Sequence, residues 1–172
     1  MIRPLTFNSG GSAAVEMALT LPILLALLCG SVELGNYFMS EHVLVKAVRD
    51  GARYAARQDL NYFTGCSGGP GGTVEGDTKT IVRTGLVSGG TNRFANITDA
   101  MITVSVSCST TAGGTALGGI YTNVKNSTGI VVGAPIVTVS ASVPYTPVLQ
   151  SYGFSGGGYN LNADQQATVI GW

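Results

Sequence analysis

An apolar run near the start of the chain limits its possible folds more than any other feature. Residues 17–32 read MALTLPILLALLCGSV and carry no charge. Together with the small apolar residues at 13–15 they form a stretch of about twenty residues, interrupted once by Glu16. As a helix, twenty residues rise about 30 Å, the thickness of the hydrocarbon core of a bilayer. The run therefore predicts a transmembrane helix.

Three other interpretations of this run compete with a transmembrane helix. A buried core helix is also apolar on all sides, but the rest of so small a chain offers little to surround it. A cleaved signal peptide needs a positively charged start, and only Arg3 and the terminal amine precede the run, although Gly30 and Ser31 are small enough for a cut. Both stay open as alternatives. A lipoprotein signal would use Cys29 but needs a small residue before it, and Leu28 stands there.

The junction before the run indicates proteolytic processing. A short polar leader ends in Gly11, and Glu16 is the fifth residue after that glycine. A carboxylate inside an apolar helix is costly and implies a partner. A cut after Gly11 would create an amine on Ser12, one helical turn from Glu16, that could balance this charge within a helix or between neighbours. Gly11 and Ser12 are therefore the candidate processing residues, and Glu16 is the candidate assembly residue.

The segment that follows the junction resembles a known family signature. Residues 11–38, GSAAVEMALTLPILLALLCGSVELGNYF, are similar to the N-terminus of TadE-like pseudopilins of the tight-adherence (Flp) type IV pilus system. The shared features are an alanine-rich stretch, Val-Glu-Met-Ala, a Leu-Pro step with leucines, and a Glu-Leu-Gly ending. The pattern positions are Gly11, Glu16, Pro22, Glu33 and Gly35. Residues 47–57 are also similar to the family, and beyond residue 60 the resemblance is loose.

This resemblance implies a minor pilin with no enzymatic activity and no cofactor. The protein would be a single-pass protein of the bacterial inner membrane, cut after Gly11 by a prepilin peptidase, with a periplasmic C-terminal head. Its partners would be the lipid bilayer, other pilin subunits and the inner-membrane assembly platform of a pilus used in surface attachment. The alternative from another class is a signal-anchored periplasmic binding or adhesin domain with no filament role.

Charge alone predicts the opposite orientation. Arg3 precedes the span, whereas four basic residues follow it: Lys46, Arg49, Arg53 and Arg57. The positive-inside rule would thus place the C-terminal part in the cytoplasm. We follow the resemblance instead, because Glu41 and Asp50 dilute the basic cluster and the leader peptidase acts on the cytoplasmic side.

Beyond the span, the sequence predicts that the same helix continues as a stalk. Apolar residues recur at spacings of three and four, and no helix breaker appears before Asn61 and Gly65. A helix is expected over residues 12–58, kinked at Pro22. The expected organisation is a leader at 1–11, a transmembrane helix at 12–34, an amphipathic stalk at 35–60 and a head at 61–172.

The head is expected to be a small α+β domain, which makes the whole chain pilin-like. Apolar residues alternate over 101–108 and 136–145, which predicts two half-buried antiparallel strands. Pro144 predicts that the second strand lies at a sheet edge or ends there. The remaining predicted elements are a short helix from Thr73 ended by residues 88–90, a short strand at 129–132 and a last strand near 167–172. The sheet is expected to pack on the stalk and the short helix.

The cysteines predict a disulfide bond. Cys66 and Cys108 lie outside the span, and a bond between them would close a loop of about 42 residues. Such a bond suits the oxidising periplasm that the resemblance implies. A metal site is disfavoured, because His42 is the sole histidine and no Cys-x-x-Cys spacing occurs. Cys29 is interpreted as an apolar filler of the span.

Composition argues against several other functions. Nine basic and nine acidic residues give a formal net charge of zero, so the chain lacks the general positive charge of a nucleic-acid-binding domain. No hydrolase site can be assembled, and the glycine-rich stretches lack the lysine of phosphate loops. Asn96 and Asn126 have glycosylation spacing but are read as turn residues. Four aromatic residues suit a sugar-binding or contact surface as well as a core: Tyr145, Tyr152, Phe154 and Tyr159.

Overall fold

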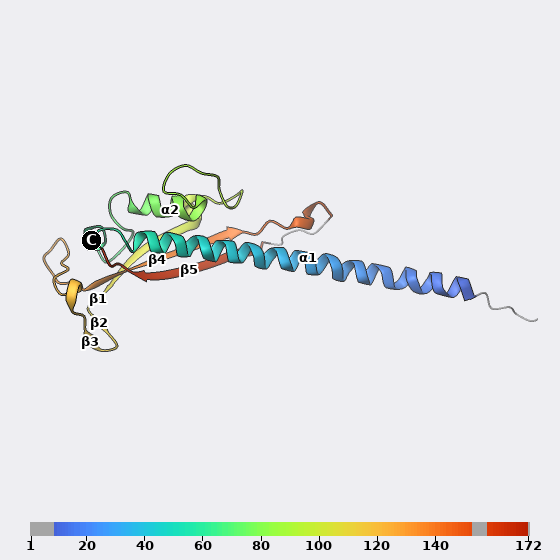
Figure 1. Cartoon of the computed structure of the whole chain (residues 1–172), viewed down its shortest axis with the longest axis horizontal. Helices are drawn as coiled ribbons and strands as arrows, with labels where there is room; N and C mark the ends of the chain where they lie inside the picture. Colours follow the sequence, from blue (N-terminus) through green and yellow to red (C-terminus); the bar gives the residue numbers. More distant parts are fainter. Residues whose placement is uncertain (1–8, 153–157, 172) are drawn as a thin grey trace, which may run out of the picture. The chain divides into compact units, whose positions relative to one another are not determined.

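The computed structural model describes residues 9–152 and 158–171 of the chain (Figure 1). The chain forms two compact units. The N-terminal unit comprises Met1–Phe38 with Thr146–Gly156, and the sheet unit comprises Met39–Tyr145 with Gly157–Trp172. Several residues of the sequence predictions lie outside the described part: residues 1–8 of the leader, the side chain of Tyr152, Phe154, the glycine loop at 155–157 and Trp172.

The first element, α1, is a single helix of 47 residues, Ser9–Ala55, with Pro22 inside it. Its length corresponds to about 70 Å at the usual helical rise. The helix ends three residues before the expected Gln58, because the backbone N–H groups of Arg57 and Gln58 donate to carbonyls three residues back. The Asp59 side chain then accepts from the N–H of Asn61 and opens the short helix η1 (Leu60–Phe63). The sequence therefore predicted the helix correctly and its end slightly too late.

Three antiparallel strands form the main sheet, in the order β1-β4-β5. They are β1 (Ile102–Ser109), β4 (Ala134–Pro144) and β5 (Asn160–Thr168). The predicted pairing of the first two is confirmed, with Val104 opposite Val139 and Val106 opposite Val137. Because β4 is the central strand, the edge position suggested by Pro144 is wrong, whereas the predicted strand end there is right. The last strand lies earlier than the predicted 167–172.

The helix α2 (Val74–Thr84) follows Thr73, as predicted. Thr73 does not cap it with its side chain, because its hydroxyl donates to the Asp77 carboxylate at 2.9 Å. The helix ends at Gly85, which adopts φ 85° and donates its N–H to the carbonyl of Ile81. The predicted end at residues 88–90 is therefore wrong.

The connection between β1 and β4 also differs from the prediction. It contains a two-stranded hairpin of β2 (Thr111–Ala112) and β3 (Thr115–Ala116), which the sequence did not predict. The strand expected at 129–132 is reduced to one bridge between Lys125 and Val131. Three short helices complete the described elements: η2 (Asp99–Met101), η3 (Gly119–Tyr121) and η4 (Val148–Tyr152).

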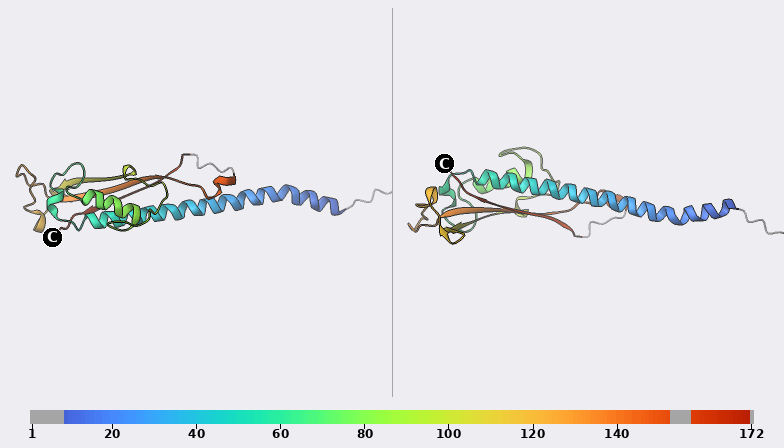
Figure 2. Two further views of the ribbon diagram at one scale, coloured as in Figure 1. Left: turned by 90° about the horizontal axis from the view of Figure 1, so that it is seen from above. Right: turned by 60° about the horizontal axis from the view of Figure 1, so that its bottom comes forward.

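The core of the sheet unit lies between one face of the sheet and the two helices. Figures 1 and 2 show the second part of α1 and α2 running alongside the three strands. The two helices are closest at Gly51, where a Cβ atom would lie 2.6 Å from Cγ2 of Val82. The fully buried residues include Leu44, Val48, Ala52, Val82, Val137, Val139 and Val143. Each large aliphatic side chain among them contributes about 1.5–3 kcal/mol by leaving water. The predicted α+β class and the sheet packed on the helices are confirmed.

Candidate functional site

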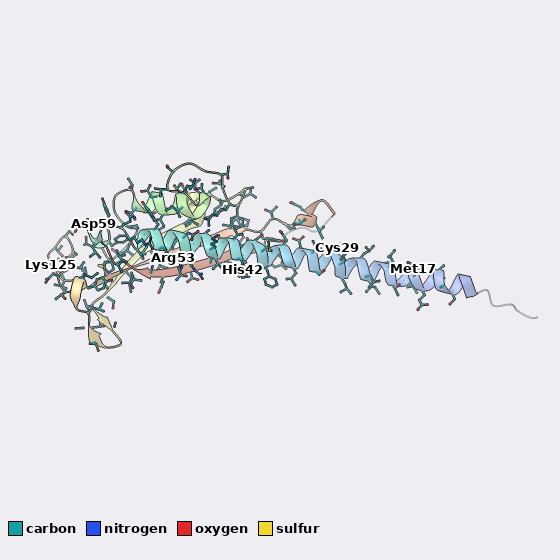
Figure 3. All side chains as sticks on the ribbon, in the orientation of Figure 1. Met17, Cys29, His42, Arg53, Asp59 and Lys125 are labelled. Atoms are coloured by element: carbon teal, nitrogen blue, oxygen red, sulfur yellow. A yellow bond between two sulfur atoms is a disulfide. The ribbon has the colours of Figure 1, made fainter. Side chains whose placement is uncertain are left out.

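The first part of α1 presents its apolar side chains to the surroundings. Met17, Leu19 and Leu27 are each more than 60% exposed, and none of the helix's most apolar 18-residue window is buried. Figure 3 shows side chains of this part, Met17 among them, pointing away from the helix axis. A buried core helix is inconsistent with this exposure. Length and composition suit a membrane anchor, and a signal sequence near the N-terminus would share them.

Polar groups in this segment are satisfied locally. The Thr20 hydroxyl donates to the carbonyl of Met17 at 3.4 Å, and the Ser31 hydroxyl donates to that of Leu28 at 2.8 Å. Back-bonding of this kind removes the cost of carrying a hydroxyl into hydrocarbon. The apolar segment therefore suits a lipid environment in its side chains as well as its backbone.

The candidate processing residues lie in the first turns of α1. Gly11 and Ser12 are exposed, and a Cβ atom on Gly11 would meet nothing within 4 Å. Glu16 is exposed one turn further on and makes no hydrogen bond or ion pair with any residue that the structure describes. The first turn of a helix has N–H groups without helical partners and opens easily. Among the described residues, therefore, nothing covers the peptide bond after Gly11 or the Glu16 carboxylate.

A second carboxylate of the family pattern, Glu33, has defined partners within the N-terminal unit. Its Oε1 accepts from the backbone N–H of Val148 at 3.3 Å, and its Oε2 accepts from that of Leu149 at 3.2 Å. Both N–H groups belong to the start of η4, so the carboxylate acts there as a helix cap acts. The sequence indicated Glu33 only as a pattern position, because no local pattern reports a partner 115 residues away.

The predicted disulfide is present in the sheet unit. Cys66 and Cys108 are joined, with 5.1 Å between their Cα atoms. The bond fastens the loop after η1 to β1, where the N–H of Val106 also donates to the carbonyl of Gly68 at 2.8 Å. The loop thereby covers part of the outer edge of β1. Cys29 is a free, half-buried cysteine in the apolar part of α1.

Three ion pairs lie within the described residues of the sheet unit. Ion pairs join Lys79 to Glu75, Arg83 to Asp99 and Arg93 to Asp50. Within the described residues, no three His, Cys, Asp or Glu side chains come together in a way that could hold a metal ion.

One tyrosine of the sheet unit has a shifted pKa. The Tyr54 hydroxyl donates to the Asp77 carboxylate at 3.2 Å. Partial burial raises the pKa of Tyr54 above its usual value, and the negative charge of Asp77 and the hydrogen bond raise it further. This arrangement keeps the phenol neutral and joins α1 to α2, so its role is structural.

Comparison with known proteins gives a match for the N-terminal helix. No curated protein and no solved structure matches the chain. A family model described as TadE-like protein matches residues 11–53, from the candidate cut almost to the end of α1. The TadE-like family is a family of pilus-associated structural proteins. Residues 11–53 of this chain are therefore TadE-like, as their motifs predicted.

Proposed function

We propose that this protein is a minor pilin (pseudopilin) that takes part in assembling a tight-adherence (Flp, type IV-like) pilus used in surface attachment. One observation carries the proposal. The segment that matches the TadE-like model begins at Gly11 and contains the exposed apolar helix, and near its start lies Glu16, which pairs with no residue that the structure describes. A helix of this kind gains free energy only when lipid or other apolar helices cover it.

The proposed topology is that of a single-pass inner-membrane protein. Residues 12–34 cross the bilayer, the leader stays in the cytoplasm and the sheet unit lies in the periplasm. The disulfide between Cys66 and Cys108 supports this orientation, because such bonds persist in oxidising compartments and are rare in the cytosol. We give this bond more weight than the basic residues after the span, which suggest the opposite orientation.

Assembly would use the first part of α1 in two ways. Its apolar side chains point outward around the helix, so the same surface that faces lipid can pack against neighbouring subunits. After cleavage, the amine of Ser12 would lie one turn from Glu16 of its own helix or beside Glu16 of a neighbour. A paired carboxylate costs far less in an apolar bundle than a lone one. The partners are therefore other pilin subunits, the assembly platform and a prepilin peptidase.

Mass measurement on the membrane-extracted protein tests the processing step. The wild type is expected to lack residues 1–11, and Gly11→Val is expected to keep them. Gly30→Val is the matched control, because a Cβ atom at either glycine meets nothing within 4 Å and neither change disturbs packing. An intact wild-type N-terminus would reject processing. An intact N-terminus would support the signal-anchored binding or adhesin domain, whereas a cut next to Ser31 that Gly30→Val blocks would identify the apolar run as a cleaved signal peptide.

A further inference from the structure

The second part of α1 and the turn that follows it carry four exposed basic residues. They are Lys46, Arg49, Arg53 and Arg57, hereafter the basic row. The spacings of three and four residues place Lys46, Arg49 and Arg53 one above the other along the helix, and Arg57 comes four residues later in the turn. Leu44 and Val48 are fully buried on the opposite side of the same helix. Figure 3 labels one member of the row, Arg53, on this part of α1.

The sheet unit does not neutralise the basic row. No side chain of its four members forms a hydrogen bond or an ion pair with any residue that the structure describes. Asp50, the acidic residue nearest to the row in sequence, is bound to Nη2 of Arg93 at 3.1 Å. Like charges at spacings of three and four destabilise a helix, whereas an opposite charge from outside would stabilise it. The row is thus available to an anionic partner.

A hollow lies beside the C-terminal end of the basic row. It has a volume of about 410 Å³ and lies between α1 and the end of α2. Arg53 and Tyr54 line it from α1, together with Asp50, which is paired with Arg93, and Arg57 and Gln58 line it from the turn after α1. Ile81, Gly85 and Val87 line it from α2 and the residues that follow. Two guanidinium groups one helical turn apart can each bind a carboxylate through two hydrogen bonds. The neighbouring apolar side chains favour an amphipathic segment over a small anion.

We propose that the basic row is the docking surface for an acidic helical face of a partner protein. A row of carboxylates repeated once per helical turn would match the spacing of the row, with Arg53 and Arg57 as its main contacts. A second copy of this chain is a poor match, because neither long helix carries carboxylates at successive turns: the acidic residues of α1 are at least eight residues apart, and the two of α2, Glu75 and Asp77, are two residues apart. The inference rests on the proposed function only in expecting this partner to be another pilus subunit.

Binding of a designed peptide tests the proposal directly. The full chain is held in nanodiscs of neutral lipid at low ionic strength, and fluorescence anisotropy reports binding of a labelled, alanine-based helical peptide with glutamate at every fourth position. A peptide of the same composition, with its glutamates spread around the helix, is the comparison. The patterned peptide is expected to bind about tenfold more tightly.

Two single substitutions locate the binding surface. Arg57→Gln is expected to weaken binding of the patterned peptide about fivefold, and its charge-matched control Lys125→Gln, at an exposed loop lysine, less than twofold. Equal affinity for the two peptides, equal losses in the two variants, or no binding would overturn the proposal. Stronger row-dependent binding to phosphatidylglycerol vesicles would overturn it too, by assigning the row to lipid. The assay needs neither peptidase nor pili, so its failure is distinct from failure of the cleavage test.

Discussion

Glu33 and Leu149 are 116 residues apart in the sequence, yet Oε2 of the Glu33 carboxylate accepts a hydrogen bond from the backbone N–H of Leu149 at 3.2 Å. The other oxygen of the same carboxylate accepts from the N–H of Val148 at 3.3 Å. Glu33 directly follows the apolar run of α1, so these bonds hold the start of η4 beside the end of that run. A carboxylate at this position thus organises a segment far along the chain.

Replacing Glu33 should release η4. Glu33→Ala removes both acceptors. Because hydrogen bonds to a charged group stabilise the folded state more than neutral ones, amide exchange at Val148 and Leu149 should accelerate about tenfold. Glu33→Gln keeps one acceptor oxygen and should show a smaller effect. Hydrogen–deuterium exchange followed by mass spectrometry measures both. Glu41→Ala is the control, and unchanged exchange in Glu33→Ala would contradict the contact.

The close approach of α1 and α2 at Gly51 predicts a second result. In Gly51→Ala the new Cβ atom would lie 2.6 Å from Cγ2 of Val82, a fully buried residue. Overpacking costs about 1–3 kcal/mol, while alanine gains about 1 kcal/mol over glycine in helix propensity. Gly51→Ala should therefore lower the free energy of unfolding of the sheet unit by about 1 kcal/mol, as measured by thermal unfolding.

Gly76 provides the matched control for Gly51. It lies in α2, and a Cβ atom there would meet nothing within 4 Å. Gly76→Ala should therefore raise the stability by up to about 1 kcal/mol. If both substitutions stabilised the protein alike, the close packing of the two helices at Gly51 would be wrong.

Tyr54 should make the stability of the sheet unit fall at high pH. Partial burial, then the charge of Asp77 and the hydrogen bond to it, raise the pKa of Tyr54 above its usual value of 10.0. The folded state thus favours the neutral phenol. Its contribution is complete below the unfolded-state pKa and is lost as the pH rises above about 10 and through the folded-state pKa. Denaturant midpoints measured from neutral to alkaline pH should follow this course.

Two variants isolate that contribution. Tyr54→Phe removes the titrating group, so its denaturant midpoint should fall less steeply at alkaline pH than that of the wild type. Asp77→Asn keeps an acceptor but removes the negative charge, so an intermediate slope is expected. A slope in Tyr54→Phe equal to that of the wild type would show that other groups cause the alkaline loss.

Local periodicity explains which parts of the fold could be predicted. The alternation in β1 and β4 reports burial directly, because Val104, Val106, Val137 and Val139 all point into the core. In β5 only Leu161 is fully buried, and asparagine, glutamine and aspartate fill most other positions. The apolar residues that follow this strand, from Val169 onward, led to a last strand being predicted near 167–172, too close to the C-terminus. A mostly polar edge strand carries too weak a pattern to be located from sequence.

In the candidate site too, features set by neighbouring residues could be predicted, and contacts between residues distant in the sequence could not. Gly11 and Glu16 could be proposed from the sequence because the expected cleavage pattern and its carboxylate lie within a few adjacent residues. The partner of Glu33 could not, because the chain must fold before η4 reaches it. The basic cluster on the stalk was also visible in the sequence. The ion pair between Asp50 and Arg93 was not, because it forms between segments that are distant in the sequence. The glycine end of α2, in contrast, was a local signal that the sequence prediction missed at Gly85.

The disulfide should contribute strongly to the stability of the sheet unit. Cys66 and Cys108 are separated by 42 residues, and removing a cross-link over such a loop costs about 3–4 kcal/mol in the chain-entropy account. The double variant Cys66→Ser/Cys108→Ser should unfold at lower denaturant concentration and be cut faster by protease in the loop that covers β1. Cys29→Ser, at the free cysteine, is the control. Identical gel mobility of the alkylated wild type with and without reductant would contradict the bond.

Glu16 should be needed for assembly but not for insertion. Glu16→Ala removes a charged side chain from near the end of the span and makes the span more apolar, so membrane insertion should be unaffected. Because no described residue pairs with Glu16, its removal should also leave the stability of the sheet unit unchanged. Without the carboxylate, however, the Ser12 amine of a processed subunit lacks its counter-charge in the apolar bundle. Pili counted by electron microscopy should fall to about a tenth or less.

The conservative variant separates charge from packing at this position. Glu16→Asp retains the carboxylate on a shorter side chain, so it should restore part of the piliation that Glu16→Ala loses. Mass measurement should show all three proteins cut after Gly11, so that loss of pili is not attributed to failed processing. Normal piliation of a correctly cut Glu16→Ala protein would exclude pairing with the Ser12 amine as the assembly step, because the amine would then need no carboxylate to enter the filament.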